Sequence, residues 1–358
     1  MRRKFSVGLA ATALGLVARG VSGASPPSAN LAAALADTKA LLNGGQQANI
    51  VVLGDSLSVR QGSYLPYFTQ HLQNFYGHAG AGFQGFSLWT GAGFNGGWLN
   101  TGINTDMNPH RSLDGLYNTH NGVPGGPVSA FYTPKDRTVQ LQYVRQPGGG
   151  SFQVMRNQQG ALVATIDTNS RERSVGTFDF TLGAGESQYT ILPLPGTPVT
   201  VLGQNNIRST PGVRVHRGAN GGWGVNNFLQ RDYTFNQQLG ILDTDLIMIW
   251  IGQNDQAYTR ASYAQRINLL VDRVQASSPA AEIVLVGTYD QGSSALSGLV
   301  DGMYDVATAR NLGFINLYGT AGNAAFFQAN GYLDDGVHFS ESGGAYVGQF
   351  LFDAFATD

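Results

Sequence analysis

The sequence predicts an α/β protein: a parallel sheet with helices on both faces, interrupted by an inserted β-sandwich of the jelly-roll type. Two observations lead to this fold class. Helical segments alternate with short apolar runs near the N-terminal end and again after residue 224, an order typical of a doubly wound sheet. Between about residues 128 and 215 the hydrophobic period changes to two, and short strands follow at regular intervals.

The first 23 residues predict a cleavable export signal. A cationic head at residues 2–4 precedes a short apolar stretch, and small residues at positions 21–23 offer a cleavage site. Residues 2–5, Arg-Arg-Lys-Phe, match a twin-arginine signal in part. The apolar stretch is too short to span a bilayer. We therefore expect export to the periplasm or beyond, with no stable membrane insertion after cleavage.

The first α/β unit follows this signal. Leucines at helical spacing predict a helix over residues 30–42, which a Gly-Gly pair ends. The apolar run 50–53 predicts a buried strand, and residues 64–76 predict a second helix that tolerates Pro66 in its first turn. This order begins a doubly wound sheet.

A glycine-rich and aromatic segment covers residues 77–98. The tetrapeptide Gly-Ala-Gly-Phe occurs at residues 80–83 and again at 91–94, and Trp89 and Trp98 lie close by. Glycine at this frequency excludes a regular helix. The segment is either a long functional loop or a packed collar of buried rings. Trp89 and Trp98 are candidates for substrate binding.

The insertion, placed at residues 126–213, is predicted from alternation of apolar and polar residues. Its strands are expected at residues 138–144, 151–155, 161–166, 177–181, 189–194 and 199–202. The α/β part, residues 24–125 and 214–358, then resumes. Its remaining strands are expected at 246–251, 282–287 and 314–317, and its helices at 263–276, 296–312 and 343–355.

Composition excludes several classes of function. The chain has no cysteine, so disulfides, thiolate metal sites and a cysteine nucleophile are excluded. Its 21 Lys and Arg against 23 Asp and Glu include no basic run, which argues against nucleic acid or an anionic membrane as a partner. No two His share the spacing of metal ligands, so we expect neither a metal nor another cofactor.

Polar or glycine residues follow four predicted strands, at the edge where parallel sheets bind ligands. These segments are Gly54-Asp55-Ser56, residues 218–222, residues 252–255 and residues 335–338. Together they hold the parts that acyl transfer needs. A serine hydroxyl requires a base, the imidazole requires a carboxylate, and the oxyanion requires N–H donors.

Each of these residues also has a purely structural interpretation. Ser56 is a favoured N-cap residue, and Asn254 is a common turn former. Asp334 competes with Asp335 as partner of His338, although a spacing of three residues lets Asp335 fold back on the same turn. Asp55 and Asp255 are expected to hold their loops by local hydrogen bonds. Gly222 is the alternative to Gly221.

The four segments resemble the four blocks of the SGNH (GDSL-like) hydrolases, a family with a flavodoxin-like three-layer α/β/α fold. The resemblance covers residues 46–100 and 213–356. It implies that Ser56 is the nucleophile, and that His338, oriented by Asp335, is the general base. By the same resemblance, the backbone N–H groups of Ser56 and Gly221 and the side-chain amide of Asn254 form the oxyanion hole.

A narrower resemblance concerns the glycine-rich segment 77–83, the insertion and residues 218–222. These are similar to bacterial O-acetylesterases and O-acetyltransferases of cell-wall and exopolysaccharides, whose inserted sandwich is like a carbohydrate-binding module. The resemblance implies a secreted serine esterase acting on acetylated carbohydrate or polysaccharide. His216 and Trp223 are further candidates for substrate binding. The alternatives are a polysaccharide O-acetyltransferase with the same site and an inactive carbohydrate-binding protein.

Overall fold

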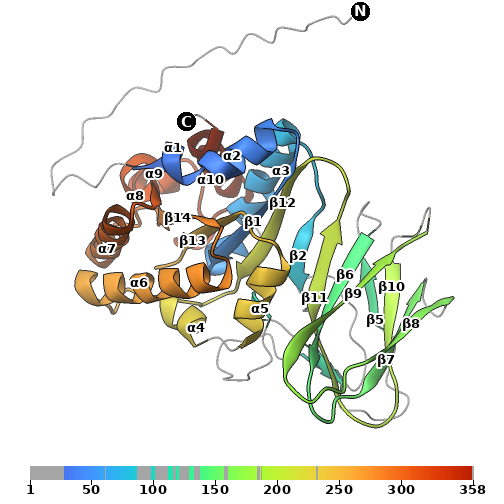
Figure 1. Cartoon of the computed structure of the whole chain (residues 1–358). Helices are drawn as coiled ribbons and strands as arrows, with labels where there is room; N and C mark the ends of the chain where they lie inside the picture. Colours follow the sequence, from blue (N-terminus) through green and yellow to red (C-terminus); the bar gives the residue numbers. More distant parts are fainter. Residues whose placement is uncertain are drawn as a thin grey trace, which may run out of the picture.

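The computed structural model describes residues 28–60, 62–86, 112–115, 138–156, 160–183, 186, 188–230 and 233–356, and the backbone of residues 98–100, 118–120 and 129–132. The predicted export signal, residue Trp89 and the side chain of Trp98 lie outside these residues. Figure 1 shows two parts side by side: helices around a parallel sheet, and a body of antiparallel strands.

The parallel sheet has five strands in the order β12-β1-β13-β14-β15. β1 is the second strand and pairs with β12 on one side and with β13 on the other, with Gly54 opposite both Ala219 and Trp250. The strands are β1 (Gln47–Gly54), β12 (Gly212–Ala219), β13 (Leu246–Trp250), β14 (Glu282–Gly287) and β15 (Gly313–Asn316).

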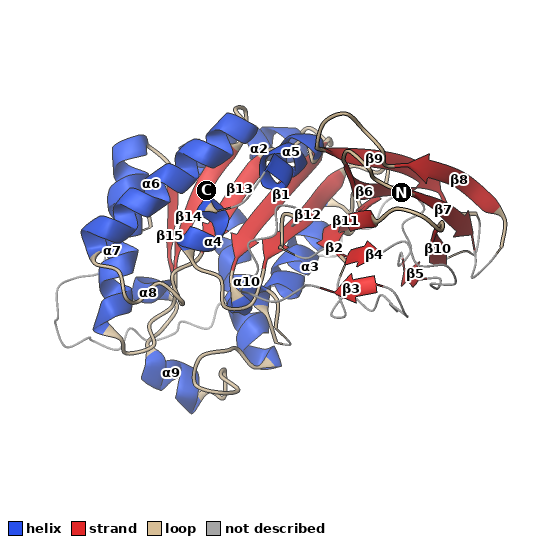
Figure 2. Cartoon of the chain, turned by 90° about the horizontal axis from the view of Figure 1, so that it is seen from below, coloured by secondary structure: helices blue, strands red, loops and turns tan. Residues whose placement is uncertain are grey.

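Alternate residues of β1 face two separate hydrophobic cores. Ile50 and Val52 belong to one core, and Val51 and Leu53 belong to the other. Helices complete each core, so the predicted three-layer α/β/α arrangement is confirmed (Figure 2). The first core receives α1 (Leu31–Ala34), α2 (Ala36–Asn43), α3 (Tyr64–Tyr76), α8 (Leu317–Thr320), α9 (Ala324–Ala329) and α10 (Glu341–Ala356). The second receives α4 (Val225–Leu229), α5 (Tyr233–Ile241), α6 (Arg260–Ser277) and α7 (Ser294–Arg310).

The antiparallel strands form two sheets. One has the order β5-β10-β7-β8, and the other has the order β3-β4-β11-β6-β9, with β2 also paired to β11. Their bounds are β2 (Gly82–Gly85), β3 (Trp98–Asn100), β4 (Asn118–His120), β5 (Ser129–Tyr132), β6 (Thr138–Arg145), β7 (Ser151–Arg156), β8 (Leu162–Asp167), β9 (Ser174–Thr181), β10 (Gln188–Pro193) and β11 (Val199–Ile207).

A third hydrophobic core lies between these two sheets. Val139 and Leu141 of β6 contribute to it from one sheet, and Phe152 of β7 and Ile191 of β10 contribute from the other. All four side chains are fully buried. Two sheets that share one core are a sandwich, as the alternating pattern predicted.

The sandwich meets the parallel sheet at β2 and β12. β2 pairs with β11 of the sandwich and also lies against β12 of the parallel sheet. A side chain at Gly82 would meet the carbonyl oxygen of Val215 at 2.1 Å, and its φ of +79° also favours glycine. The first strand that pairs with the sandwich thus begins at residue 82, whereas the insertion was predicted to begin at residue 126.

β12 was not predicted as a strand of the parallel sheet. Residues up to about 215 alternate between apolar and polar types, the insertion was placed as far as residue 213, and no strand was expected over residues 212–219. The polar residues Arg214 and His216 are nevertheless buried, because each has partners inside the protein. The first predicted helix is also divided, since α1 and α2 meet at Leu35.

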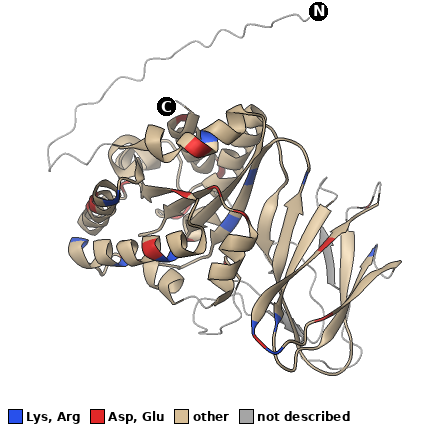
Figure 3. Ribbon diagram, in the orientation of Figure 1, with Lys and Arg blue, Asp and Glu red and all other residues tan. Residues whose placement is uncertain are grey.

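Charged residues of both signs are scattered along the ribbon (Figure 3). In the part of the chain that the structure describes, no helix combines the length and the apolar character needed to cross a bilayer.

Candidate active site

The predicted site residues follow strands that are neighbours in the parallel sheet. Gly221 follows β12, Ser56 follows β1, and Asn254 follows β13, and these three strands are adjacent in that order. Because the strands are parallel, all three residues lie at the same edge of the sheet. His338 comes from the loop between α9 and α10.

Ser56 is the first residue of a 3₁₀ turn, η1 (Ser56–Ser58), directly after β1. Asp55, not Ser56, caps this turn: its carboxylate accepts a hydrogen bond of 2.9 Å from the backbone N–H of Leu57. The Ser56 hydroxyl is therefore not used as a cap. Ser56 is buried, with 8% of the residue exposed.

Asp335 and His338 share one turn, as their spacing predicted. Oδ1 of Asp335 accepts hydrogen bonds from the backbone N–H groups of His338, at 2.8 Å, and of Val337, at 3.1 Å. Gly336 has a φ of +82°, a conformation that suits glycine at this turn. The Tyr289 hydroxyl donates to the carbonyl of Val337 and holds the loop beside β14.

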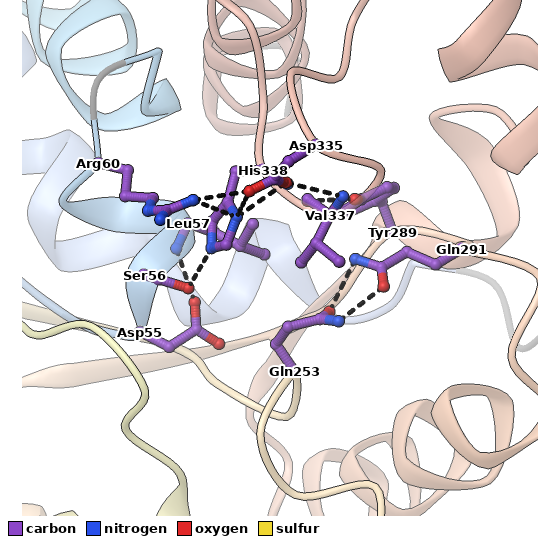
Figure 4. Close-up of polar contacts among 10 residues, drawn as sticks. All are labelled: Asp55, Ser56, Leu57, Arg60, Gln253, Tyr289, Gln291, Asp335, Val337 and His338. Carbon is purple, nitrogen blue, oxygen red and sulfur yellow. Dashed lines mark hydrogen bonds and ion pairs between the residues drawn. The ribbon is translucent and has the colours of Figure 1, made fainter. Parts of the chain in front are cut away.

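Ser56, His338 and Asp335 form a continuous chain of contacts (Figure 4). Nε2 of His338 lies 2.9 Å from Oγ of Ser56, and Nδ1 lies 2.8 Å from Oδ2 of Asp335. The hydrogen bond from the backbone N–H of His338 lowers the pKa of Asp335 well below its usual range, and the imidazole contact acts in the same direction. The carboxylate is therefore ionised and can stabilise positive charge on the ring.

Arg60 adds a cation to this chain. It follows η1, where its backbone N–H donates to the carbonyl of Ser56. Its Nη1 lies 2.8 Å from Oδ2 of Asp335 and 2.7 Å from Nδ1 of His338 (Figure 4). The sequence reasoning missed this residue, although it lies only four positions after Ser56, next to the turn that carries this serine.

Gly221 and Asn254 lie on loops that are connected to each other. The side-chain amide of Asn254 donates a hydrogen bond of 2.9 Å to the carbonyl of Trp223, two residues after Gly221. An amide NH₂ has two N–H donors, so this bond leaves the second available for a ligand. Gly222 has a φ of +71°, whereas Gly221 does not have a positive φ.

Two buried carboxylates support these loops. Asp255 accepts hydrogen bonds from the backbone N–H of Val225, at 3.0 and 3.1 Å, and thereby joins the loop after β13 to the start of α4. Burial raises the pKa of Asp255 to about 6. Burial also raises the pKa of Asp55 to about 7, and the nearby Asp255 adds to this shift. Asp55 makes the local hydrogen bond that was predicted, to Leu57, whereas Asp255 bonds to Val225, 30 positions earlier in the sequence.

His216 and Trp223 are fully buried, so substrate contact by either side chain is not supported. Nδ1 of His216 accepts a hydrogen bond of 2.9 Å from the backbone N–H of Phe83 in β2. Burial, together with nearby Arg214, lowers the pKa of His216 to about 3. The Trp223 ring packs edge-on against Phe228 in the second core. Trp89 and the side chain of Trp98 lie outside the described residues.

A reciprocal pair of amides, Gln253 and Gln291, joins the loops after β13 and β14. Each side chain donates to the other, at 2.6 and 2.9 Å (Figure 4). Sequence reasoning did not select either residue, because glutamine has no catalytic signature of its own. No group of three or more metal-ligating side chains gathers within the described ranges of the chain.

Comparison of the sequence with known protein families shows the family to which the chain belongs. Residues 156–346, just over half of the chain, match the profile of the GDSL-like Lipase/Acylhydrolase family. The matched region contains Gly221, Asn254, Asp335 and His338 and begins after Ser56. No curated protein matches the sequence.

The structure is similar to that of a peptidoglycan O-acetylesterase, with a TM-score of 0.74 and 18% identity over 90% of this chain and 95% of that chain. At this identity the likeness shows the fold alone. Two family two carbohydrate esterases are also matched. One is from Cellvibrio japonicus, and the other is from Clostridium thermocellum in complex with cellohexaose. The first has a TM-score of 0.33 and 12% identity over 77% of this chain and 97% of that chain. The second has a TM-score of 0.35 and 13% identity over 73% of this chain and 98% of that chain. TM-scores this low do not establish a shared fold, so nothing is inferred from these two structures.

Proposed function

The chain belongs to the GDSL-like lipase/acylhydrolase family, and from this premise we propose that it is a serine esterase that removes acetyl groups from a carbohydrate or polysaccharide. One observation carries the proposal: the Ser56 hydroxyl is 2.9 Å from Nε2 of His338, whose Nδ1 is 2.8 Å from the ionised Asp335. A hydroxyl, a base and a carboxylate in this order can perform acyl transfer.

In the proposed reaction, Ser56 attacks the ester carbonyl while His338 accepts its proton at Nε2. Asp335 holds the ring by its Nδ1–H and stabilises the imidazolium. The negative charge on the carbonyl oxygen is met by the backbone N–H groups of Ser56 and Gly221 and by the amide of Asn254. His338 then returns its proton to the leaving alcohol, and water releases the acid from Ser56 by the same route.

The carbohydrate substrate is supported by the similarity of fold to a peptidoglycan O-acetylesterase over nearly the whole of both chains. The inserted sandwich is part of that shared length. The proposal includes export by the signal predicted over residues 1–23, which would bring the enzyme to polysaccharides outside the cytoplasm.

The test is acetate release from a panel of acetylated polysaccharides, with 4-nitrophenyl acetate as a general ester. We expect the wild-type protein to release free acetate and Ser56→Ala to release none. Ser58→Ala is a matched control, because the Ser58 hydroxyl bonds to Tyr64 and not to the imidazole. Hydrolysis of 4-nitrophenyl acetate alone would reject the carbohydrate substrate. If the protein hydrolysed none of these esters, the proposal of esterase activity would be rejected.

A further inference from the structure

Arg60 lies against the Asp335–His338 pair in a way that the proposed reaction does not use. One nitrogen, Nη1, is within hydrogen-bonding distance of both Oδ2 of Asp335 and Nδ1 of His338. The side chain is 55% exposed, and the side chain of Asp335 is 47% exposed. In the part of the chain that the structure describes, Nε and Nη2 of Arg60 have no hydrogen-bond partner.

The positions of the hydrogens on Arg60 and His338 show that the contact between the two side chains opposes catalysis. A guanidinium donates hydrogen bonds and never accepts them. Its 2.7 Å contact with Nδ1 is therefore a hydrogen bond only if Nδ1 carries no proton. The ring proton is then on Nε2, which donates to Ser56 Oγ and cannot take the hydroxyl proton, and Nδ1 has no hydrogen to donate to Asp335, 2.8 Å away. If Nδ1 instead carries the proton, two donors face each other at 2.7 Å.

Charge leads to the same conclusion. The imidazole becomes positive when it takes the proton from Ser56, and Asp335 is the group that stabilises this charge. A guanidinium that shares the Asp335 carboxylate weakens that stabilisation and repels the ring. Catalysis is therefore favoured when Arg60 moves away from Nδ1.

Arg60 can move at small cost. Ion pairs between exposed side chains contribute little to stability, because water solvates the separated charges well. The planar guanidinium binds a carboxylate through two parallel N–H groups, and Nε and Nη2 are available for such a bond. An anion beside the exposed Arg60 side chain would thus compete directly with Asp335 for it.

We propose that Arg60 is a specificity residue that binds a carboxylate of the substrate and, in doing so, leaves Nδ1 of His338 to Asp335. The substrate class is then an acetyl ester on an acidic sugar, such as a uronic acid unit. This inference rests on the proposed function, because it assigns a part of the substrate to the same site. No group is transferred to Arg60; only hydrogen bonds are exchanged.

The test uses two acetyl esters whose phenolic leaving groups differ only in whether the carboxyl group is free or methylated. These are 3-acetoxybenzoate, which has a carboxylate, and methyl 3-acetoxybenzoate, which does not. We expect the wild-type protein to have the higher kcat/KM for 3-acetoxybenzoate and to lose this preference in concentrated NaCl, which screens charges. In Arg60→Gln the preference should disappear. The neutral ester should be hydrolysed about two- to fivefold faster, the rate equivalent of one exposed ion pair.

Arg310→Gln is the matched control. It removes the same charge and an ion pair with Asp272, but Arg310 precedes β15 and so lies at the opposite edge of the sheet. It should keep the wild-type preference. Equal kcat/KM values for the two esters in the wild-type protein would overturn the proposal. So would a proportional loss of both activities in Arg60→Gln, which would make Arg60 a support of the triad. Hydrolysis by Ser56→Ala would instead reject the proposed function.

Discussion

The hydroxyl of Ser56 and the imidazole of His338 are 282 positions apart in the sequence and 2.9 Å apart in the structure. The contact depends on two short turns. η1 presents the hydroxyl at the end of β1, and the turn from Asp335 to His338 presents the ring. Because Asp335 bonds both the backbone and the ring of His338, it fixes the position of the imidazole.

Asn254 is expected to act on the transition state. Its amide has one N–H on the carbonyl of Trp223, so the other is free to meet an oxyanion without a change of side-chain position. In Asn254→Ala we expect kcat for 4-nitrophenyl acetate to fall about 10²- to 10³-fold, with little change in KM. Steady-state kinetics and a thermal unfolding scan measure the two effects.

Gln256→Ala is the control for this prediction, since Gln256 is an exposed residue of the same loop. Its activity should stay near that of the wild-type protein. If Asn254→Ala keeps the wild-type kcat while remaining folded, Asn254 is not an oxyanion donor.

Among the elements, η1 depends on a carboxylate that is costly to ionise. Burial raises the pKa of Asp55 from 3.8 to about 7, so between these pH values the folded protein holds a proton that the unfolded chain has released. The free energy of unfolding contributed by this group is therefore greatest at low pH and falls as pH rises from about 4 to 7. The slope is at most about 1.4 kcal/mol per pH unit.

Asp55→Asn should remove this part of the pH dependence, because an amide does not titrate. Denaturant unfolding of the wild-type protein and of Asp55→Asn at several pH values between 5 and 8 measures this pH dependence of stability. The wild-type protein should lose more stability than the variant over this range. The exposed Asp37→Asn should follow the wild-type curve, and parallel curves for Asp55→Asn would contradict the account.

Elements with a simple apolar pattern were predicted well. α3 and β14 begin and end where the pattern placed them, at Tyr64–Tyr76 and Glu282–Gly287. β12 was not predicted as a strand of the parallel sheet, because Arg214 and His216 give it an alternating pattern in place of a continuous apolar run. Arg214 is buried since its guanidinium donates to Asn49 and to the carbonyl of Ala79, partners that the sequence does not reveal.

For the whole molecule, a buried amide network links the α/β layers to the sandwich. Gln238 of α5 donates a 2.6 Å hydrogen bond to Gln142 of β6 and accepts one of 2.6 Å from the backbone N–H of Leu113. Both glutamines are fully buried. Gln238→Ala leaves these partners unpaired, so we expect the free energy of unfolding to fall by about 1–3 kcal/mol.

This variant should keep its kcat for 4-nitrophenyl acetate, because Gln238 touches none of the residues around Ser56. Denaturant unfolding and steady-state kinetics test the two parts. Gln349→Ala is the control, because Gln349 is only half-buried on α10 and its side chain donates to Asp353 of the same helix. An unchanged free energy of unfolding in Gln238→Ala would mean that the amide network does not hold the two parts together.

The placement of the candidate site residues was largely predictable, whereas their surroundings were not. Ser56, Gly221, Asn254 and His338 each follow a strand or loop at one edge, and the order of their motifs identified them. The contacts of Arg60 and the burial of Trp223 depend on how side chains pack across elements. Such packing leaves no periodic signal in a single sequence.

The account depends above all on Ser56 as the acylated residue. Brief reaction with 4-nitrophenyl acetate at low pH, followed by acid quenching, proteolysis and mass spectrometry, locates the acetyl group directly. We predict an acetylated peptide that contains Ser56, no acetylated peptide in Ser56→Ala, and much slower acetylation in His338→Ala. An acetyl group on another residue, with Ser56 unmodified, would contradict the account.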